Sequence, residues 1–182
     1  MIEWRNDKLK DLSTAELLEL RDLAVASDID EPENSPTKEA LTQQIKDFSE
    51  REGVIVLRGF SGEELAASSL IVPSKTSKFF IVNKDMIDSL ESTIGDSIDT
   101  AFVPAYLYLH PKYRGKGLGK TLSKETVDAA KENGFKFLLG YGLHNTVTRS
   151  FFSHNYDMIE TELHCHSPLE RDDMTVIRYT PI

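Results

Sequence analysis

The chain has 182 residues, of which 40% are hydrophobic and 28% charged, values typical of one globular domain with a substantial core. Its formal net charge is −9, and residues 1–100 alone carry 11 basic and 21 acidic side chains, a balance of −10. Because such a chain repels nucleic-acid phosphates at long range, we expect no nucleic-acid partner. No apolar run is long enough to cross a bilayer, and Met1–Arg5 does not look like the start of a signal peptide.

Cys165 is the only cysteine, which excludes an internal disulfide and a cysteine-rich zinc site. His164 and His166 flank it. In a strand, neighbouring side chains point to opposite faces, so these three side chains cannot easily share one ion. We therefore expect no metal, no membrane partner and a reducing, cytoplasmic location.

The first part of the chain has helical periodicity. Ser13 and Glu16 have the spacing of a capping box, and apolar residues then recur at helical spacing up to Ser27. An acidic stretch with two prolines follows. Pro36 can open a second helix, which Gly53 ends.

The rest of the chain alternates mainly between strands and helices. The best strand signal runs from Thr100 to His110, where Pro104 indicates a bulge or an edge. A helical stretch follows Gly119 and stops at Asn133-Gly134. The other predicted elements are strands over 54–58, 68–72, 79–82, 135–141, 158–165 and 174–179, and short helices over 86–93 and 144–154. Together they predict an α/β fold, with one mixed sheet flanked by helices, in a single domain over residues 1–182.

A basic, glycine-rich turn joins the strongest strand to the helix after Gly119. Glycines at 115, 117 and 119 let phosphate oxygens approach the backbone, and the N–H groups at the start of a helix bind anions. A tight turn would explain the glycines but not the basic residues beside them. These are Lys112, Arg114, Lys116, Lys120 and Lys124. The segment therefore predicts a pyrophosphate site.

Three glycine-rich motifs compete for this segment. Gly119-Lys120-Thr121 supplies the end of a nucleoside-triphosphate loop, but Arg114 stands where that loop needs its first glycine. The dinucleotide pattern Gly-x-Gly-x-x-Gly fails because its third glycine would fall at residue 120. The pattern Arg-x-x-Gly-x-Gly from Arg114 to Gly119, between a strand and a helix, resembles the acyl-CoA loop of the GNAT (Gcn5-related N-acetyltransferase) superfamily.

The element order that we infer from the sequence, β-α-α-β-β-β-α-β-α-β-β, matches the fold of this family. The resemblance implies a mostly antiparallel sheet and acetyl-CoA as co-substrate. The pantetheine arm would pair with the strand Leu107–Leu109, and an amide near Leu109 would face the thioester oxygen. The implied cofactor-binding residues are Leu107, Tyr108, Leu109, Arg114, Gly115, Lys116, Gly117, Leu118, Gly119, Lys120, His144 and Asn145.

Members of this family often carry a tyrosine that protonates the departing thiolate. Aligned on the family pattern, Phe151 takes that position when His144 takes the preceding Asn position, and Phe152 takes it when Asn145 does. We choose Phe151 as the residue at the tyrosine position. His110 is a candidate for the general base, because the ordinary pKa of histidine is near ~6.5. The alternative that His110 has no catalytic task stays open.

The acceptor implied by the resemblance is an amine of a small molecule or peptide. The acidic stretch after Ser27 would suit a cationic amine. A non-catalytic acyl-CoA-binding module stays open as the alternative, and so does a homodimer. Glu160, Glu162 and His164 share one strand face, which we interpret as solvated.

Overall fold

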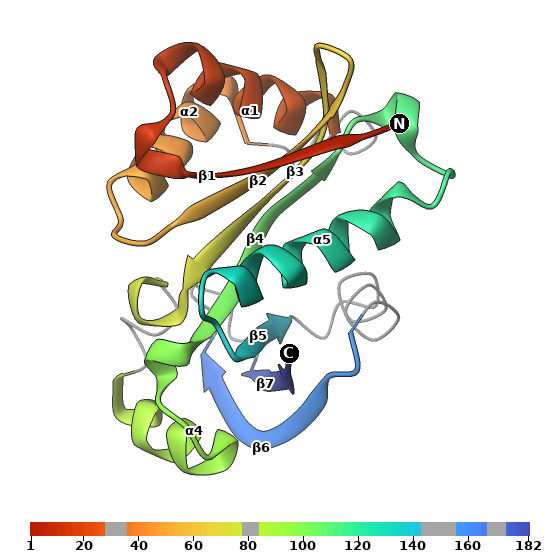
Figure 1. Cartoon of the computed structure of the whole chain (residues 1–182). Coiled ribbons are helices and arrows are strands. Elements are labelled where there is room, and N and C mark those ends of the chain that lie inside the picture. Colours follow the sequence, from red (N-terminus) through yellow and green to blue (C-terminus); the bar gives the residue numbers. More distant parts are fainter. Residues whose placement is uncertain (28–35, 78–83, 143–155, 167–173) are drawn as a thin grey trace. The chain divides into compact units, whose positions relative to one another are not determined.

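A computed structural model describes residues 1–27, 36–77, 84–142, 156–166 and 174–182. Its strands are β1 (Glu3–Lys8), β2 (Ile55–Ser61), β3 (Glu64–Pro73), β4 (Ala101–Leu109), β5 (Phe137–Gly142), β6 (Ile159–His166) and β7 (Met174–Pro181). Its α-helices are α1 (Thr14–Ser27), α2 (Lys38–Ser49), α4 (Ile87–Ile94) and α5 (Leu118–Glu132). The strands form one sheet in the order β1-β2-β3-β4-β5-β7-β6 (Figure 1). β4 and β5 pair in parallel, whereas β1–β2, β2–β3, β5–β7 and β6–β7 pair antiparallel. The predicted mixed, mostly antiparallel sheet flanked by helices is confirmed.

The chain divides into two compact units. The first combines Met1–Ile71 with Ala105–Ala129, and the second combines Val72–Pro104 with Ala130–Ile182. The prediction of a single domain stays a prediction. Among the described residues, no helix is both long and apolar enough to cross a membrane.

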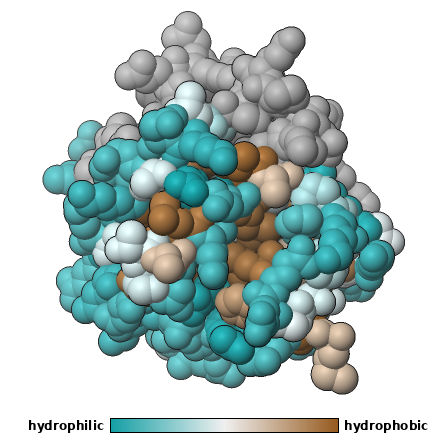
Figure 2. Space-filling view, turned by 90° about the horizontal axis from the view of Figure 1, so that it is seen from above, coloured by the Kyte–Doolittle hydropathy of each residue, from teal (hydrophilic) through white to brown (hydrophobic). Residues whose placement is uncertain are grey.

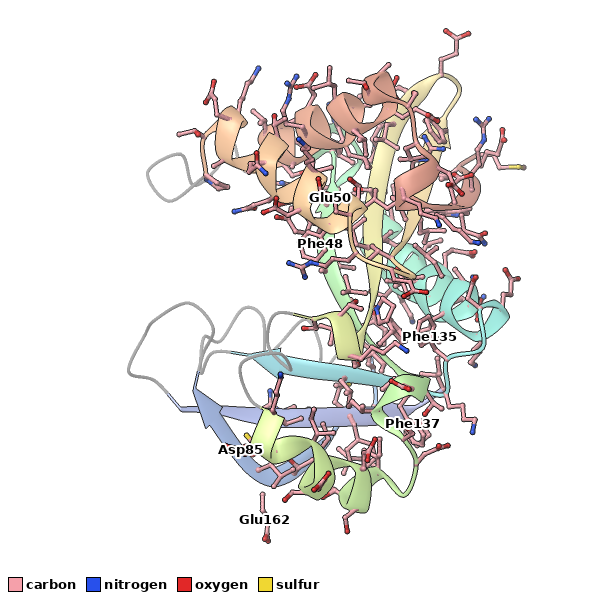
Figure 3. The ribbon with its side chains drawn as sticks, turned by 90° about the vertical axis from the view of Figure 1, so that its left-hand side faces the viewer. Phe48, Glu50, Asp85, Phe135, Phe137 and Glu162 are labelled. Carbon is pink, nitrogen blue, oxygen red and sulfur yellow. The ribbon has the colours of Figure 1, made fainter. Side chains whose placement is uncertain are left out.

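In the first unit, helices cover both faces of β2 and β3. Figures 1 and 3 show α1 and α2 together on one face and α5 on the other. Residues 54–60 and 65–74 are buried throughout, as expected for strands covered on both faces. This double burial explains why Val54–Leu57 and Leu70–Val72 read as continuous apolar runs rather than as alternating ones.

Figure 2 shows one face of the molecule, with apolar colour in a hollow and polar residues around it. Among the described residues, Met1 and Ile159 are the only large apolar side chains that are exposed, the latter to about half. The apolar colour in the hollow therefore comes from partly covered side chains.

The predicted capping box starts α1. The Ser13 amide and hydroxyl donate to Glu16 Oε2 at 2.8 and 2.7 Å, and the Glu16 amide donates to Ser13 Oγ at 3.3 Å. Arg58 of β2, whose side chain is 7% exposed, donates to Glu16 at 2.8 Å and to Asp7 at 2.7 Å. The hydrogen bonds from Ser13, followed by the one from Arg58, lower the pKa of Glu16 to about 2. Glu16 therefore both caps α1 and attaches this helix to β2 through Arg58.

The first strand and the second helix differ most from the prediction. The sequence pattern assigned no residues to the first strand, which is β1 and pairs with β2 from Glu3↔Phe60 to Lys8↔Ile55. α2 begins after Thr37, whose side chain accepts from the Ala40 amide at 3.2 Å, and not at Pro36. It ends at Ser49, before Gly53. The strand predicted over 79–82, the helix over 144–154 and the acidic stretch after Ser27 lie outside the described residues.

The second unit has its own core beneath α4. The buried residues of this core are Leu90, Ile94, Ile98, Ala101, Val103, Leu139 and Ile177. Phe137 of β5 packs against this core (Figure 3). On β6, Glu162 is exposed and extends away from the ribbon in Figure 3, whereas Glu160 accepts from Arg178 of β7 at 2.8 Å. Glu162 therefore fits the predicted solvated face.

Candidate active site

Among the described residues, β4 pairs with β5 only at Ala101 and Phe102, so its C-terminal half has no strand partner on the edge away from β3. The His110 amide donates to the Ala66 carbonyl of β3 at 2.9 Å. Successive backbone N–H groups of a strand point to opposite edges, so the Leu109 amide points to the edge away from β3. The Leu109 carbonyl accepts from the Ser27 hydroxyl at 3.1 Å, and Leu107, Tyr108 and Leu109 are all half-buried. An extended ligand arm could pair with this edge as an added strand.

Tyr106 interrupts the regular strand just before this edge. Its φ of 51° makes it the one non-glycine residue with positive φ among the described residues, two positions after the Pro104 that indicated a bulge. Such a conformation costs about 1–3 kcal/mol and is concentrated at functional sites. The Tyr106 hydroxyl donates to Gln44 of α2, and burial raises its pKa to about 12. Phe48, labelled in Figure 3, meets the Tyr106 ring edge-on at 5.2 Å.

A narrow pocket lies beside Tyr106. It holds about 10 Å³, roughly the room of one water molecule. Its lining combines apolar side chains, two phenol rings and one serine: Leu20, Ile45, Ser68, Leu70, Tyr106 and Tyr108. The side chains that face β4 from α1 and α2 are therefore mainly apolar.

After β4 the chain makes a short 3-10 turn, Pro111–Tyr113, and then the glycine turn that opens α5. Gly115 and Gly117 have φ values of 73° and 77°, which glycine adopts without strain. A Cβ at either position would meet no described atom within 4 Å, so the space over the turn is open. Among the described residues, the amides of Gly115, Lys116 and Gly117 donate to no backbone carbonyl. Together with the first amides of a 15-residue helix, they suit an anion.

The five cations of this region differ in their partners. Lys112 pairs with Glu64 of β3 at 2.6 Å, and Lys124 pairs with Asp128 at 2.5 Å. The Arg114 guanidinium donates to the Ser27 carbonyl at the end of α1. Lys116 Nζ donates to the Lys112 carbonyl at 3.1 Å. Neither Lys116 nor Lys120 forms an ion pair with a described acidic residue, so both charges are available to an anion at the turn.

His110 accepts a hydrogen bond at one ring nitrogen from within its own turn, and its other ring nitrogen faces β3. Nδ1 accepts from the Lys112 amide at 3.3 Å, and Nε2 lies 4.0 Å from Glu64 Oε1. A neutral ring that accepts at Nδ1 carries its proton on Nε2. The lone pair that a general base needs is therefore engaged by the Lys112 amide. This geometry favours His110 as the cap of the turn over His110 as the base.

Sequence reasoning missed Glu64, which accepts from Lys112 and from the Tyr113 hydroxyl, each at 2.6 Å. Its distance of 48 and 49 residues along the chain leaves no local signal. The remaining predicted site residues, His144, Asn145 and Phe151, lie outside the described residues, so their roles stay predictions.

The family model of the acetyltransferase (GNAT) family matches residues 21–156, which is more than half of the chain. The chain belongs to this family. Family membership supports acetyl transfer as its activity. The resemblance drawn from the Arg114–Gly119 motif is confirmed.

Solved structures share this GNAT fold at low sequence identity. A GNAT-family protein from Desulfovibrio desulfuricans has 12% identity and a TM-score of 0.66, with 100% of this chain and 99% of that chain covered. Escherichia coli ElaA has 17% identity and a TM-score of 0.64, with 98% and 99% covered. PaiA N-acetyltransferase from Thermoplasma acidophilum, solved in complex with coenzyme A, has 19% identity and a TM-score of 0.59, with 100% and 99% covered. No curated protein sequence matches the chain.

Proposed function

We propose that this GNAT protein is an N-acetyltransferase that moves the acetyl group of acetyl-CoA to a primary amine of a small molecule or peptide. The observation that carries the proposal is the turn from Arg114 to Lys120, with its positive-φ glycines, its amides without backbone partners and two available lysines. The complex of the Thermoplasma relative with coenzyme A supports the same ligand for this chain.

The residues of the turn fit the pyrophosphate of acetyl-CoA. The amides of residues 115–119 would donate to its oxygens, and Lys116 and Lys120 would balance its charge. Arg114, which donates to Ser27, would hold the turn against the end of α1. ATP offers similar phosphates, but it has no arm that could pair with the open edge of β4.

Leu107–Leu109 would bind the pantetheine arm through backbone groups. When bound, acetyl-CoA supplies an activated thioester, and the Leu109 amide would donate to the oxygen on which negative charge develops. The amine would attack directly in a ternary complex, so that no nucleophilic side chain is needed. The proton of the amine would leave through water, because the Nδ1 lone pair of His110 accepts from the Lys112 amide.

We also propose that the acceptor amine is cationic. The balance of −10 over residues 1–100 would attract a cationic amine. Phe151, at the family's tyrosine position, would leave the coenzyme A thiolate without a phenol donor, so water or a nearby hydroxyl would protonate it.

The test is amine-dependent release of the coenzyme A thiol from acetyl-CoA, measured for polyamines, amino acids, aminoglycosides and peptide N-termini. We expect turnover with at least one amine and a higher kcat/KM for acceptors with a second positive charge. That advantage should shrink as salt is raised. Binding of coenzyme A without turnover of any amine would favour the acyl-CoA-binding module instead, and a preference for acidic amines would contradict a cationic acceptor.

A further inference from the structure

Glu64 holds together the turn that precedes the phosphate-binding residues. It lies at the start of β3, beside the end of β4, where the His110 amide bonds to Ala66. One of its carboxylate oxygens accepts from Lys112 Nζ and from the Tyr113 hydroxyl, each at 2.6 Å. The other lies 4.0 Å from His110 Nε2. Three residues of a single turn thus converge on one carboxylate.

This turn leads directly into the glycine turn. Within it, the Tyr113 amide donates to the His110 carbonyl at 2.9 Å, and the Arg114 amide donates to the Pro111 carbonyl at 3.1 Å. Lys116 Nζ returns to the Lys112 carbonyl at 3.1 Å. A shift of the Lys112–Tyr113 segment would therefore move Arg114 and Lys116.

We infer that Glu64 is a positioning residue for coenzyme A binding, because it fixes the turn from which the phosphate-binding amides start. This inference rests on the proposed function. Bonds from Lys112 and then Tyr113 lower the pKa of the Glu64 carboxyl, so it is ionised at neutral pH. It touches neither the phosphates nor the thioester in this scheme. Its effect reaches the ligand through the backbone.

Positioning and simple charge predict opposite signs when Glu64 is neutralised. Glu64 is an anion near a site for an anionic ligand, so if it acted through charge alone, its removal would tighten binding of coenzyme A. If it positions the turn, its removal loosens the amides and weakens binding in spite of the more favourable charge. We expect weaker binding.

The matched control is Glu63→Gln. Glu63 precedes Glu64 on the same hairpin, is exposed and has no polar contact with a described residue, so this variant removes the same charge without touching the turn. We expect Glu63→Gln to bind coenzyme A as tightly as the wild type or slightly more tightly.

The experiment is calorimetric titration of coenzyme A into the wild type, Glu64→Gln, Glu64→Ala, Tyr113→Phe and the double variant Glu64→Gln/Tyr113→Phe. Charge-assisted hydrogen bonds are strong enough for about a tenfold rise in Kd for Glu64→Ala, and we expect about threefold for Glu64→Gln and for Tyr113→Phe. The rise in Kd of the double variant should be smaller than the product of the two single rises, because both substitutions remove the same contact between Tyr113 and Glu64. With an active acceptor, KM for acetyl-CoA should rise while kcat stays near the wild-type value.

If the wild type fails to bind coenzyme A, the proposed function itself is wrong. If the wild type binds and Glu64→Gln binds equally or more tightly, the positioning role is wrong and the function stands. Tyr113→Phe, which leaves all charges in place, decides the question should the Glu64 variants not fold. Unchanged affinity in that variant would overturn the inference.

Discussion

Gly117→Glu is expected to abolish coenzyme A binding at concentrations that saturate the wild type. Gly117 has a φ of 77° and open space where a Cβ would lie, so a glutamate there would extend over the amides at the start of α5. Its carboxylate would meet the pyrophosphate at close range, and such like-charge contacts cost several kcal/mol. We expect a rise in Kd of at least about 100-fold, measured by calorimetric titration.

Gly134→Glu is the control for this variant. Gly134 also has positive φ, 85°, and open space around a built Cβ, but it follows the other end of α5. Both substitutions should lower the free energy of unfolding by a similar amount, roughly 1–2 kcal/mol, because a side chain is strained in this conformation. Gly134→Glu should keep the wild-type Kd. An undiminished affinity in Gly117→Glu would remove the turn from the proposed site.

Leu109→Pro should lower kcat by about 10²–10³-fold, the loss typical of removing one oxyanion donor. Proline has no N–H, and the Leu109 amide points away from β3, so the substitution should spare the β3–β4 hydrogen bonds. The measurement is kcat with saturating acetyl-CoA and an active acceptor, alongside the melting temperature.

Leu109→Ala separates the amide from the side chain at this position. It keeps the N–H and removes the leucine, so we expect kcat within about threefold of the wild type if only the amide takes part. A folded Leu109→Pro with the same kcat as Leu109→Ala would place the oxyanion donor elsewhere.

The parts of the fold predicted best are those with strong local signals. The strand over 100–110 appears as β4, one residue shorter at each end, and the helix after Gly119 appears as α5, which runs from Leu118 to Glu132. The first strand lacked such a signal because Glu3, Arg5 and Asp7 make it look like a polar terminus. Tertiary pairing decides it: Trp4 lies opposite Gly59, where an added Cβ would come within 2.5 Å of the indole ring. The missing side chain at Gly59 makes room for Trp4.

The candidate site was predictable in its backbone and less so in its side chains. Glycine spacing alone predicts the turn, because positive φ at residues 115 and 117 is a local property. The partners of the cations are not local. Lys112 is neutralised by a carboxylate 48 residues away, and Arg114 reaches a carbonyl 87 residues away. The capping role of His110, whose Nδ1 accepts from the Lys112 amide, also had no signal in the sequence.

The most direct test of the central claim is an amide-resolved NMR titration of the ¹⁵N-labelled protein with coenzyme A. If the turn binds the pyrophosphate, the largest shifts should fall on the amides of residues 115–119, with further shifts on Leu107–Leu109 of β4 from the pantetheine arm. ATP should shift the turn more weakly and leave β4 unchanged. Saturable binding with shifts confined to residues outside the turn and β4 would contradict the account.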